Sequence, residues 1–171
     1  MRSIFYSQLL KLDFPMESSH PTFMRLALRE AEKAGRKGEV PVGAVVVLNG
    51  RVVGRGHNKT ETRQSALEHA EQVALRSAAK KLKSWRLTDC DLYVTLEPCT
   101  MCGGAVVLSR IRNLVYGTAD PKAGAVVSTA RVLDNPKLNH RVAIAGGILK
   151  EECAALLSGF FRALRKKPGK K

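Results

Sequence analysis

Apolar and polar positions along the chain follow two different periods, which predicts a mixture of helices and strands. Apolar residues recur every three to four positions over residues 21–34, and a glycine comes next, so an amphipathic helix is expected there. Val40 to Leu48 is an almost continuous apolar run, and Asn49-Gly50 is a strong signal for a tight hairpin turn. The residues from Arg51 to Gly56 are therefore expected to return as a second strand.

The rest of the chain continues this alternation after a polar connection at residues 59–66. In chain order, the pattern predicts a helix over 69–82, a strand over 92–96, a helix beginning near Cys99, a strand over 113–117, a short helix over 128–133, a strand over 142–145 and a closing helix over 152–162. Alternating helices and strands of this kind predict an α/β fold. We expect a three-layer αβα sandwich with a central five-stranded mixed sheet.

The length of 171 residues suits a single domain with its own core, which we place at residues 16–162. Residues 1–15 share no pattern with the rest of the chain and are expected to be a disordered N-terminal extension. Residues 163–171 are expected to be a basic C-terminal tail, because six of the ten residues from Arg162 to Lys171 are Lys or Arg.

Three residues have the composition of a catalytic zinc site. Such a site usually takes three protein ligands and leaves the fourth position to water, and His69, Cys99 and Cys102 supply that number. Pro98 suits the first position of a helix, so both cysteines are expected in its first turn. Their spacing puts the two sulfurs on one face, near the positive end of the helix dipole, which favours the metal-binding thiolate.

Glu71 lies two positions after His69 and is the candidate catalytic residue. It cannot easily share a coordination direction with His69, yet it can reach a metal-bound water and exchange protons with it. Backbone N–H groups at Ala70 and Cys99 lie at predicted helix starts, where such donors are free to orient a substrate base or a hydroxide.

The cysteines also allow a non-enzymatic interpretation, in which Cys-x-x-Cys is structural or redox-active within an RNA-binding module. A structural zinc site wants a fourth ligand, and the fold would have to recruit His57 or Cys90 for it. Cys153 is expected as a buried thiol on the apolar side of the closing helix. The sequence assigns no role to Cys90, His57 or His140.

The net charge of +14 indicates which kind of partner the protein binds. A basic protein of this size favours a polyanion such as nucleic acid. Cys99 and Cys102 are better explained as metal ligands than as disulfide partners, so we expect a reducing, cytoplasmic location. No apolar run approaches the roughly eighteen residues that a membrane span needs, so we expect no membrane partner.

Several segments then carry a family resemblance. His69-Ala70-Glu71 followed by Pro98-Cys99-Thr100-Met101-Cys102 resembles the H-x-E…P-C-x-x-C signature of the zinc-dependent nucleobase deaminases. Further segments resemble the bacterial tRNA-specific adenosine deaminases: Val40–Ala44, Gly56-His57-Asn58, Asp120–Gly124, Asn139–Val142 and the run over 152–162. The resemblance spans roughly residues 20 to 165.

The resemblance implies a cytidine-deaminase-like fold and the hydrolytic deamination of adenosine to inosine at the wobble position of the tRNA anticodon. It implies one Zn²⁺ per subunit, a zinc-bound hydroxide that attacks C6, Glu71 as the proton shuttle, a homodimer, the anticodon stem-loop of tRNA as partner, and no organic cofactor. It also implies substrate contacts, which we carry over to Asn58, Ala70, Lys122, Phe161, Arg162 and Arg165. The rival enzyme is a deaminase of another small base or nucleotide, which would share the same zinc site.

Overall fold

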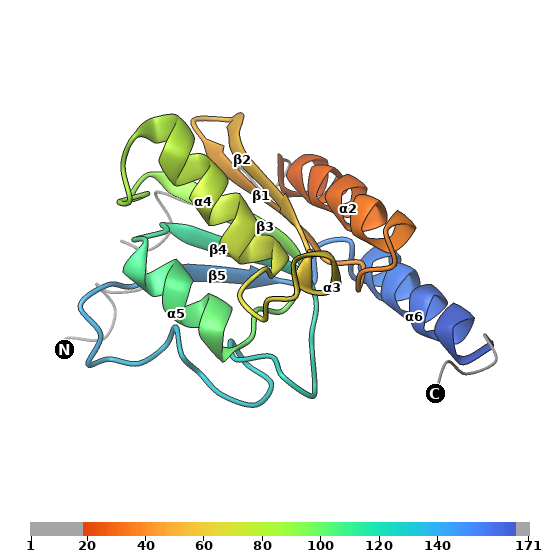
Figure 1. Ribbon diagram of the computed structural model, residues 1–171. Helices are drawn as coiled ribbons and strands as arrows, with labels where there is room; N and C mark the ends of the chain where they lie inside the picture. The colour runs from red at the N-terminus through yellow and green to blue at the C-terminus, as the bar shows by residue number, and fades with distance from the viewer. Residues whose placement is uncertain (1–18, 167–171) are drawn as a thin grey trace.

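The computed structural model describes residues 19–166, which form three layers with a sheet in the middle (Figure 1). The elements are α2 (His20–Arg36), β1 (Gly43–Leu48), β2 (Arg51–His57), α3 (Thr60–Arg63), α4 (Ala70–Leu82), β3 (Cys90–Leu96), α5 (Thr100–Leu108), β4 (Asn113–Thr118), β5 (Ala143–Gly146) and α6 (Lys150–Lys166).

The sheet has five strands in the order β2-β1-β3-β4-β5, and it is mixed. β1 pairs antiparallel with both β2 and β3, whereas β3, β4 and β5 run parallel. Parallel neighbours need a crossover connection, and α5 provides it between β3 and β4. The predicted five-stranded mixed sheet is confirmed.

Helices cover both faces of the sheet, which confirms the three-layer sandwich (Figure 1). On one face α4 and α5 bury apolar residues such as Ala74 and Val106 against Leu92 and Leu114 of the sheet. On the other face α2 and α6 bury Met24 and Cys153, among others, against the opposite side of β1, β3 and β4. Each central strand is therefore buried on both sides, which explains why these strands appear in the sequence as continuous apolar runs.

α4 lies unusually close to β2, and this closeness depends on glycine. A Cβ atom on Gly56 would lie 2.2 Å from the carbonyl oxygen of Ala70 and 2.5 Å from the backbone nitrogen of Ala74. A side chain there would push the start of α4 off the sheet. The glycine therefore fixes where His69, the residue just before the helix, is presented.

Some expectations differ from the structure. The polar connection predicted at 59–66 contains the short helix α3, and the short helix predicted at 128–133 is wrong, because that segment forms turns and irregular backbone. α6 continues through residue 166, so the first residues of the predicted tail are helical. Residues 1–15 and 167–171 lie outside the described residues. Over residues 19–166, no helix combines the length and apolarity that crossing a membrane requires.

Candidate metal centre and active-site pocket

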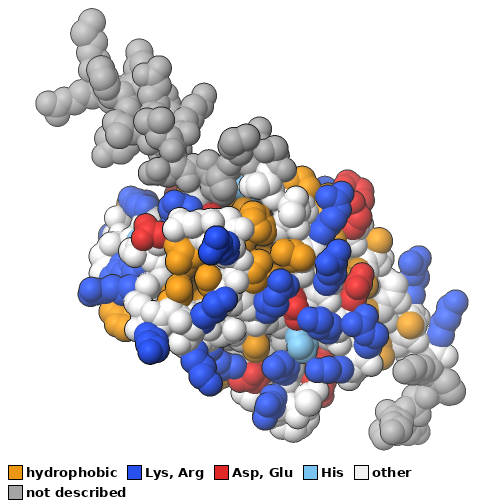
Figure 2. Space-filling model, turned by 90° about the horizontal axis from the view of Figure 1, so that it is seen from above, with side chains coloured by type: hydrophobic (Ala, Val, Ile, Leu, Met, Phe, Trp, Pro, Cys, Tyr) orange, Lys and Arg blue, Asp and Glu red, His pale blue; other side chains and the backbone are white. Residues whose placement is uncertain are grey.

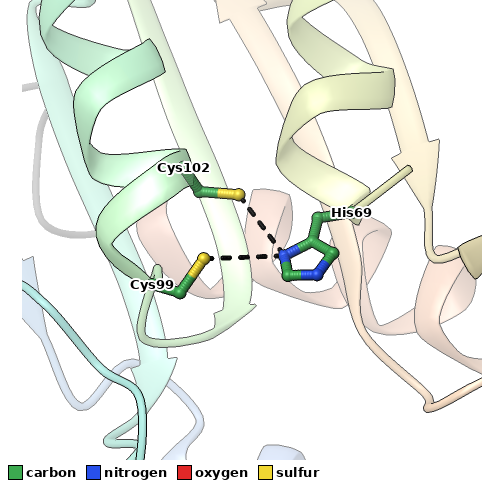
Figure 3. Close-up of side chains that lie close together, drawn as sticks. All are labelled: His69, Cys99 and Cys102. Atoms are coloured by element: carbon green, nitrogen blue, oxygen red, sulfur yellow. Dashed lines mark hydrogen bonds between the residues drawn. The ribbon is translucent and has the colours of Figure 1, made fainter. Parts of the chain in front are cut away.

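The side chains of His69, Cys99 and Cys102 converge on one point (Figure 3). The Nδ1 atom of His69 lies 3.6 Å from the sulfur of Cys99 and 3.6 Å from the sulfur of Cys102, and all three atoms lie within 4.8 Å of one another. In a tetrahedral zinc site, with bonds of about 2.1 Å to nitrogen and about 2.3 Å to sulfur, a nitrogen and a sulfur ligand are about 3.6 Å apart. The three side chains therefore fit a zinc ion.

Two helix starts bring these ligands together. His69 is the N-cap of α4 and Cys99 the N-cap of α5, and both have extended backbone conformations. α5 begins at Thr100, so Pro98 precedes the cap rather than occupying the first helical position as predicted. Cys102 lies in the first turn and is buried. Hydrogen bonds from Cys102 and from His69 lower the pKa of Cys99 to about 3, so the thiolate that a metal needs is the favoured form.

The other two cysteines and His57 lie apart from this group. Burial raises the pKa of Cys90 to about 11 and that of Cys153 to about 12, as expected for inert thiols in the core. His57 ends β2, where its ring contacts Glu30 at 3.3 Å. In the described part of the chain, neither His57 nor Cys90 joins the metal-ligand group as a fourth member.

Glu71 is buried beside the ligand group, with 4% of its surface exposed. Burial raises the pKa of its carboxyl, and His69, Cys99 and Cys102 are close enough to influence that pKa. Glu71 also lines a cavity of about 280 Å³, which has room for a single nucleobase. The cavity is lined by Glu39, Val40, Val42, Asn58, Thr60, Glu61, His69, Glu71, Leu96, Glu97, Cys99, Asp120 and Ala123.

Asn58 lines this cavity and is tied to the start of α4. Its Oδ1 accepts a hydrogen bond from the backbone N–H of Ala70 at 2.9 Å. This bond fixes the orientation of the amide and leaves its NH₂ group to donate elsewhere. The Ala70 N–H, predicted to orient the substrate base, already has an acceptor within the protein.

A second cavity adjoins the first. It has a volume of about 420 Å³, shares Val40, Leu96 and Asp120 with the first cavity, and is also lined by Lys122 and Phe161. The structure therefore brings these two predicted contact residues to one place, although 39 positions separate them in the chain. Arg162 and Arg165 are exposed on the same helix as Phe161, three residues apart, which places them on one helical face.

Two buried carboxylates around the cavity were not predicted. Glu39 is 1% exposed and accepts the N–H groups of Glu61 at 3.1 Å and Thr62 at 2.7 Å, which holds α3 in place. Glu97 is 2% exposed and holds a loop on the other side. The signal available in the sequence was the place of Glu97 directly between an apolar strand and Pro98, where an acid must be buried.

Comparison with known proteins agrees with this geometry. Residues 18–165 match the model of the MafB19-like deaminase family. A tRNA-specific adenosine deaminase of Bacillus subtilis is 50% identical over 145 residues, which are 85% of this chain and 90% of that protein. One from Aquifex aeolicus is 48% identical over 143 residues, 84% of this chain and 94% of that protein.

Solved structures agree as well. A chain from structural studies of A-to-I editing by tRNA:A34 deaminases at the wobble position of transfer RNA superimposes with a TM-score of 0.77 at 47% identity, covering 80% of this chain and 99% of that one. A guanine deaminase of Nitrosomonas europaea, at 22% identity, shares the fold with a TM-score of 0.71 over 94% of this chain and 93% of its own. The chain belongs to the tRNA-specific adenosine deaminase family.

Proposed function

We propose that this protein deaminates adenosine to inosine at the wobble position of a tRNA anticodon, with Zn²⁺ held by His69, Cys99 and Cys102. The observation that carries the proposal is the convergence of these three ligands next to a base-sized cavity, which His69, Cys99 and the buried Glu71 line. Imidazole with two thiolates at tetrahedral spacing favours zinc over harder metals. A tRNA substrate also supports the expected cytoplasmic location.

The chain's own residues account for the proton transfers. When bound, zinc would lower the pKa of a water from about 15.7 to about 7 and so supply a nucleophile at neutral pH. Glu71 takes the proton of the attacking water, delivers it to N1 of adenine, and carries the next proton to the departing amino group. The products are inosine and ammonia. The NH₂ group of Asn58, which the bond from Ala70 leaves available, would hold the base, and the burial of Glu71 would keep other water out of the exchange.

A tRNA substrate explains features that a free base does not require. The charge of +14 favours a polyanion, and Lys and Arg side chains spread over the face seen in Figure 2. Lys122 and Phe161 line the second cavity next to the catalytic one, where a nucleotide neighbouring the target base would lie. A deaminase of free bases would need only the first cavity.

The test is the sequencing of a tRNA transcript with adenosine at the wobble position after incubation with the protein. We expect inosine in place of adenosine at the wobble position and at no other position of the transcript. Parallel incubations with free adenosine, cytosine and guanine should show no ammonia release. Deamination of a free base with the tRNA left intact would contradict the proposal.

The exposed arginines of α6 are expected to contact RNA phosphates. Changing both Arg162 and Arg165 to Gln should weaken tRNA binding and reduce the slope of log K against log salt by roughly 1.4 to 1.8, because each lost phosphate contact removes about 0.7 to 0.9. Lys80 and Lys83 offer a matched control, since they have the same spacing at the far end of α4 and are also exposed. Equal salt slopes for the two double variants would contradict the assignment.

We further propose that a second copy of the chain covers the outer surface of α4 and α5. Trp85 and Leu108 are 59% and 72% exposed and line an apolar groove of about 350 Å³ together with Leu75, Leu87 and Ala105. Exposed apolar surface of this kind usually marks an interface.

If two copies of the chain meet at this groove, a charge introduced into it should weaken the dimer. Changing Leu108 to Lys should raise the dissociation constant of the dimer by about 100-fold or more, because the substitution removes a buried apolar contact and introduces a charge. Sedimentation equilibrium measures this constant. Leu164 on α6, which is 45% exposed, gives the matched control when changed to Lys. A dimer unaffected by the Leu108 change would place the interface elsewhere.

A further inference from the structure

The carboxylate of Glu97 joins a loop to the end of the sheet. Glu97 directly follows β3, and its Oε1 accepts three consecutive backbone N–H groups at 3.0, 2.8 and 3.0 Å, from Val126, Val127 and Ser128. Its Oε2 accepts the N–H of Asp120 at 3.0 Å and the hydroxyl of Ser128. One buried carboxylate thus takes five hydrogen bonds from the two ends of a loop that spans residues 119–129.

The Glu97 side chain is buried, with 2% of its surface exposed. A buried carboxylate needs hydrogen-bond donors from the protein, and the loop supplies five of them. The loop is therefore tied to the end of the sheet by a group that has no access to water as an alternative partner.

The loop forms part of the wall between the two cavities, together with Val40 and Leu96. Asp120 and Ala123 line the first cavity, and Asp120 and Lys122 line the second. The carboxylate of Asp120 in turn accepts the N–H groups of Lys122 at 3.0 Å and Ala123 at 3.2 Å. A continuous chain of contacts thus runs from Glu97 through Asp120 to the turn that presents Lys122.

The loop packs directly against the Glu97 carboxylate at Gly124, where there is no room for a side chain. A Cβ atom on Gly124 would lie 2.4 Å from the carboxyl carbon of Glu97. Gly124 also forms a β-bridge with Cys99, and the next residue, Ala125, donates its N–H to the carbonyl of Pro98 at 2.8 Å. The loop is therefore fitted onto the segment that carries a metal ligand.

We propose that Glu97 is a positioning residue for the RNA substrate: its carboxylate fixes the 119–129 loop, which forms part of the wall that the two cavities share, and so places Lys122 for binding. The inference rests on the proposed function. If the loop is released, only a fraction of the molecules has this part of the wall in place. The apparent affinity for RNA is then the intrinsic affinity multiplied by that fraction.

The Glu97→Gln substitution is expected to release one end of the loop and to keep the other end attached. A glutamine has one oxygen, which can keep the three N–H groups of residues 126–128, but its NH₂ group cannot accept the N–H of Asp120. We expect the Asp120 amide to exchange its hydrogen about tenfold faster while that of Val127 changes little. The KM for an anticodon-loop hairpin with adenosine at the wobble position should rise about tenfold, with kcat and the bound metal nearly unchanged.

Asp91→Asn is the matched control. Asp91 is a buried carboxylate at the opposite end of β3, 4% exposed, and it accepts hydrogen bonds from Arg112 at 3.1 Å and Asn113 at 2.6 Å. This variant should lose stability but keep the wild-type KM. A milder probe is Ser128→Ala, which removes one donor to Glu97 and should raise KM in the same direction by a smaller factor.

The results distinguish this inference from the proposed function. An unchanged KM and unchanged loop exchange in Glu97→Gln would overturn the inference, as would a loss of bound metal, since the effect would then run through Cys99. No inosine from the unsubstituted protein would overturn the proposed function instead, and the exchange measurement would still report on the anchor.

Discussion

Replacing Glu71 with glutamine is expected to slow deamination by about 100- to 10,000-fold while the metal stays bound. Glutamine keeps the volume of a side chain that is only 4% exposed, but it cannot take a proton from water and return it to the base. Since Glu71 is not among the three converging ligands, the metal content should not change. Single-turnover rates on tRNA, with metal measured on the same samples, check both expectations.

Glu32→Gln is the control for this experiment. Glu32 is exposed on α2, the helix that covers the other face of the sheet from α4 and α5. Its replacement should leave the rate within about twofold, because surface substitutions away from a site usually have small effects. Normal deamination by the Glu71 variant would remove this residue from its proposed role.

The second large effect is expected from removing a metal ligand. Cys102→Ala leaves two of the three converging atoms, so zinc should be lost. Without the metal, the pKa of the attacking water returns from about 7 toward 15.7, and the rate should fall by at least about 1,000-fold. The fold should persist, because the apolar clusters on both faces of the sheet do not depend on the ion. Metal analysis, circular dichroism and deamination assays on one preparation measure the metal content, the fold and the rate.

Cys153→Ala removes a comparable buried thiol at a distance from the site, where it lies on α6 and packs against the sheet. This control should keep its metal and its activity and lose only stability, by about 1 kcal/mol. Full activity of the metal-free Cys102 variant would show that the ion is not needed for the reaction.

The sequence predicted the elements that have a clear period. Apolar runs located the central strands, and the three-to-four spacing located α2 and α4, because these patterns reflect burial on a sheet or against it. The converging ligands were also predictable, since a three-residue spacing at a helix start determines where two sulfurs point. The short helix α3 was not predicted, although the equally short β5 was predicted over 142–145. α3 has four residues, too few for a period, and it is held by Glu39, 22 and 23 residues away in the chain.

The anchors of the cavity walls escaped prediction for a different reason. Glu97 binds mainly backbone amides of residues 120–128, and backbone amides leave no trace in a sequence. The predicted helix at 128–133 failed nearby, because the N–H groups of Thr129 and Val132 bond to the carbonyls of Gly124 at 2.8 Å and Ala125 at 3.0 Å, which are not the partners that a helix would give them. Long-range contacts to the main chain therefore decided what local patterns could not.

The way Glu97 holds its loop has a consequence for how such enzymes diversify. An anchor that binds main-chain amides makes no demand on most of the side chains it supports, so the loop can accept substitutions without losing its place. The reacting groups, in contrast, stand on helices packed against the sheet and are inherited with the fold. Mutational libraries aimed at new nucleobases should therefore vary Ala119, Pro121 and Ala123 and leave Glu97, Asp120, Lys122 and Gly124 untouched.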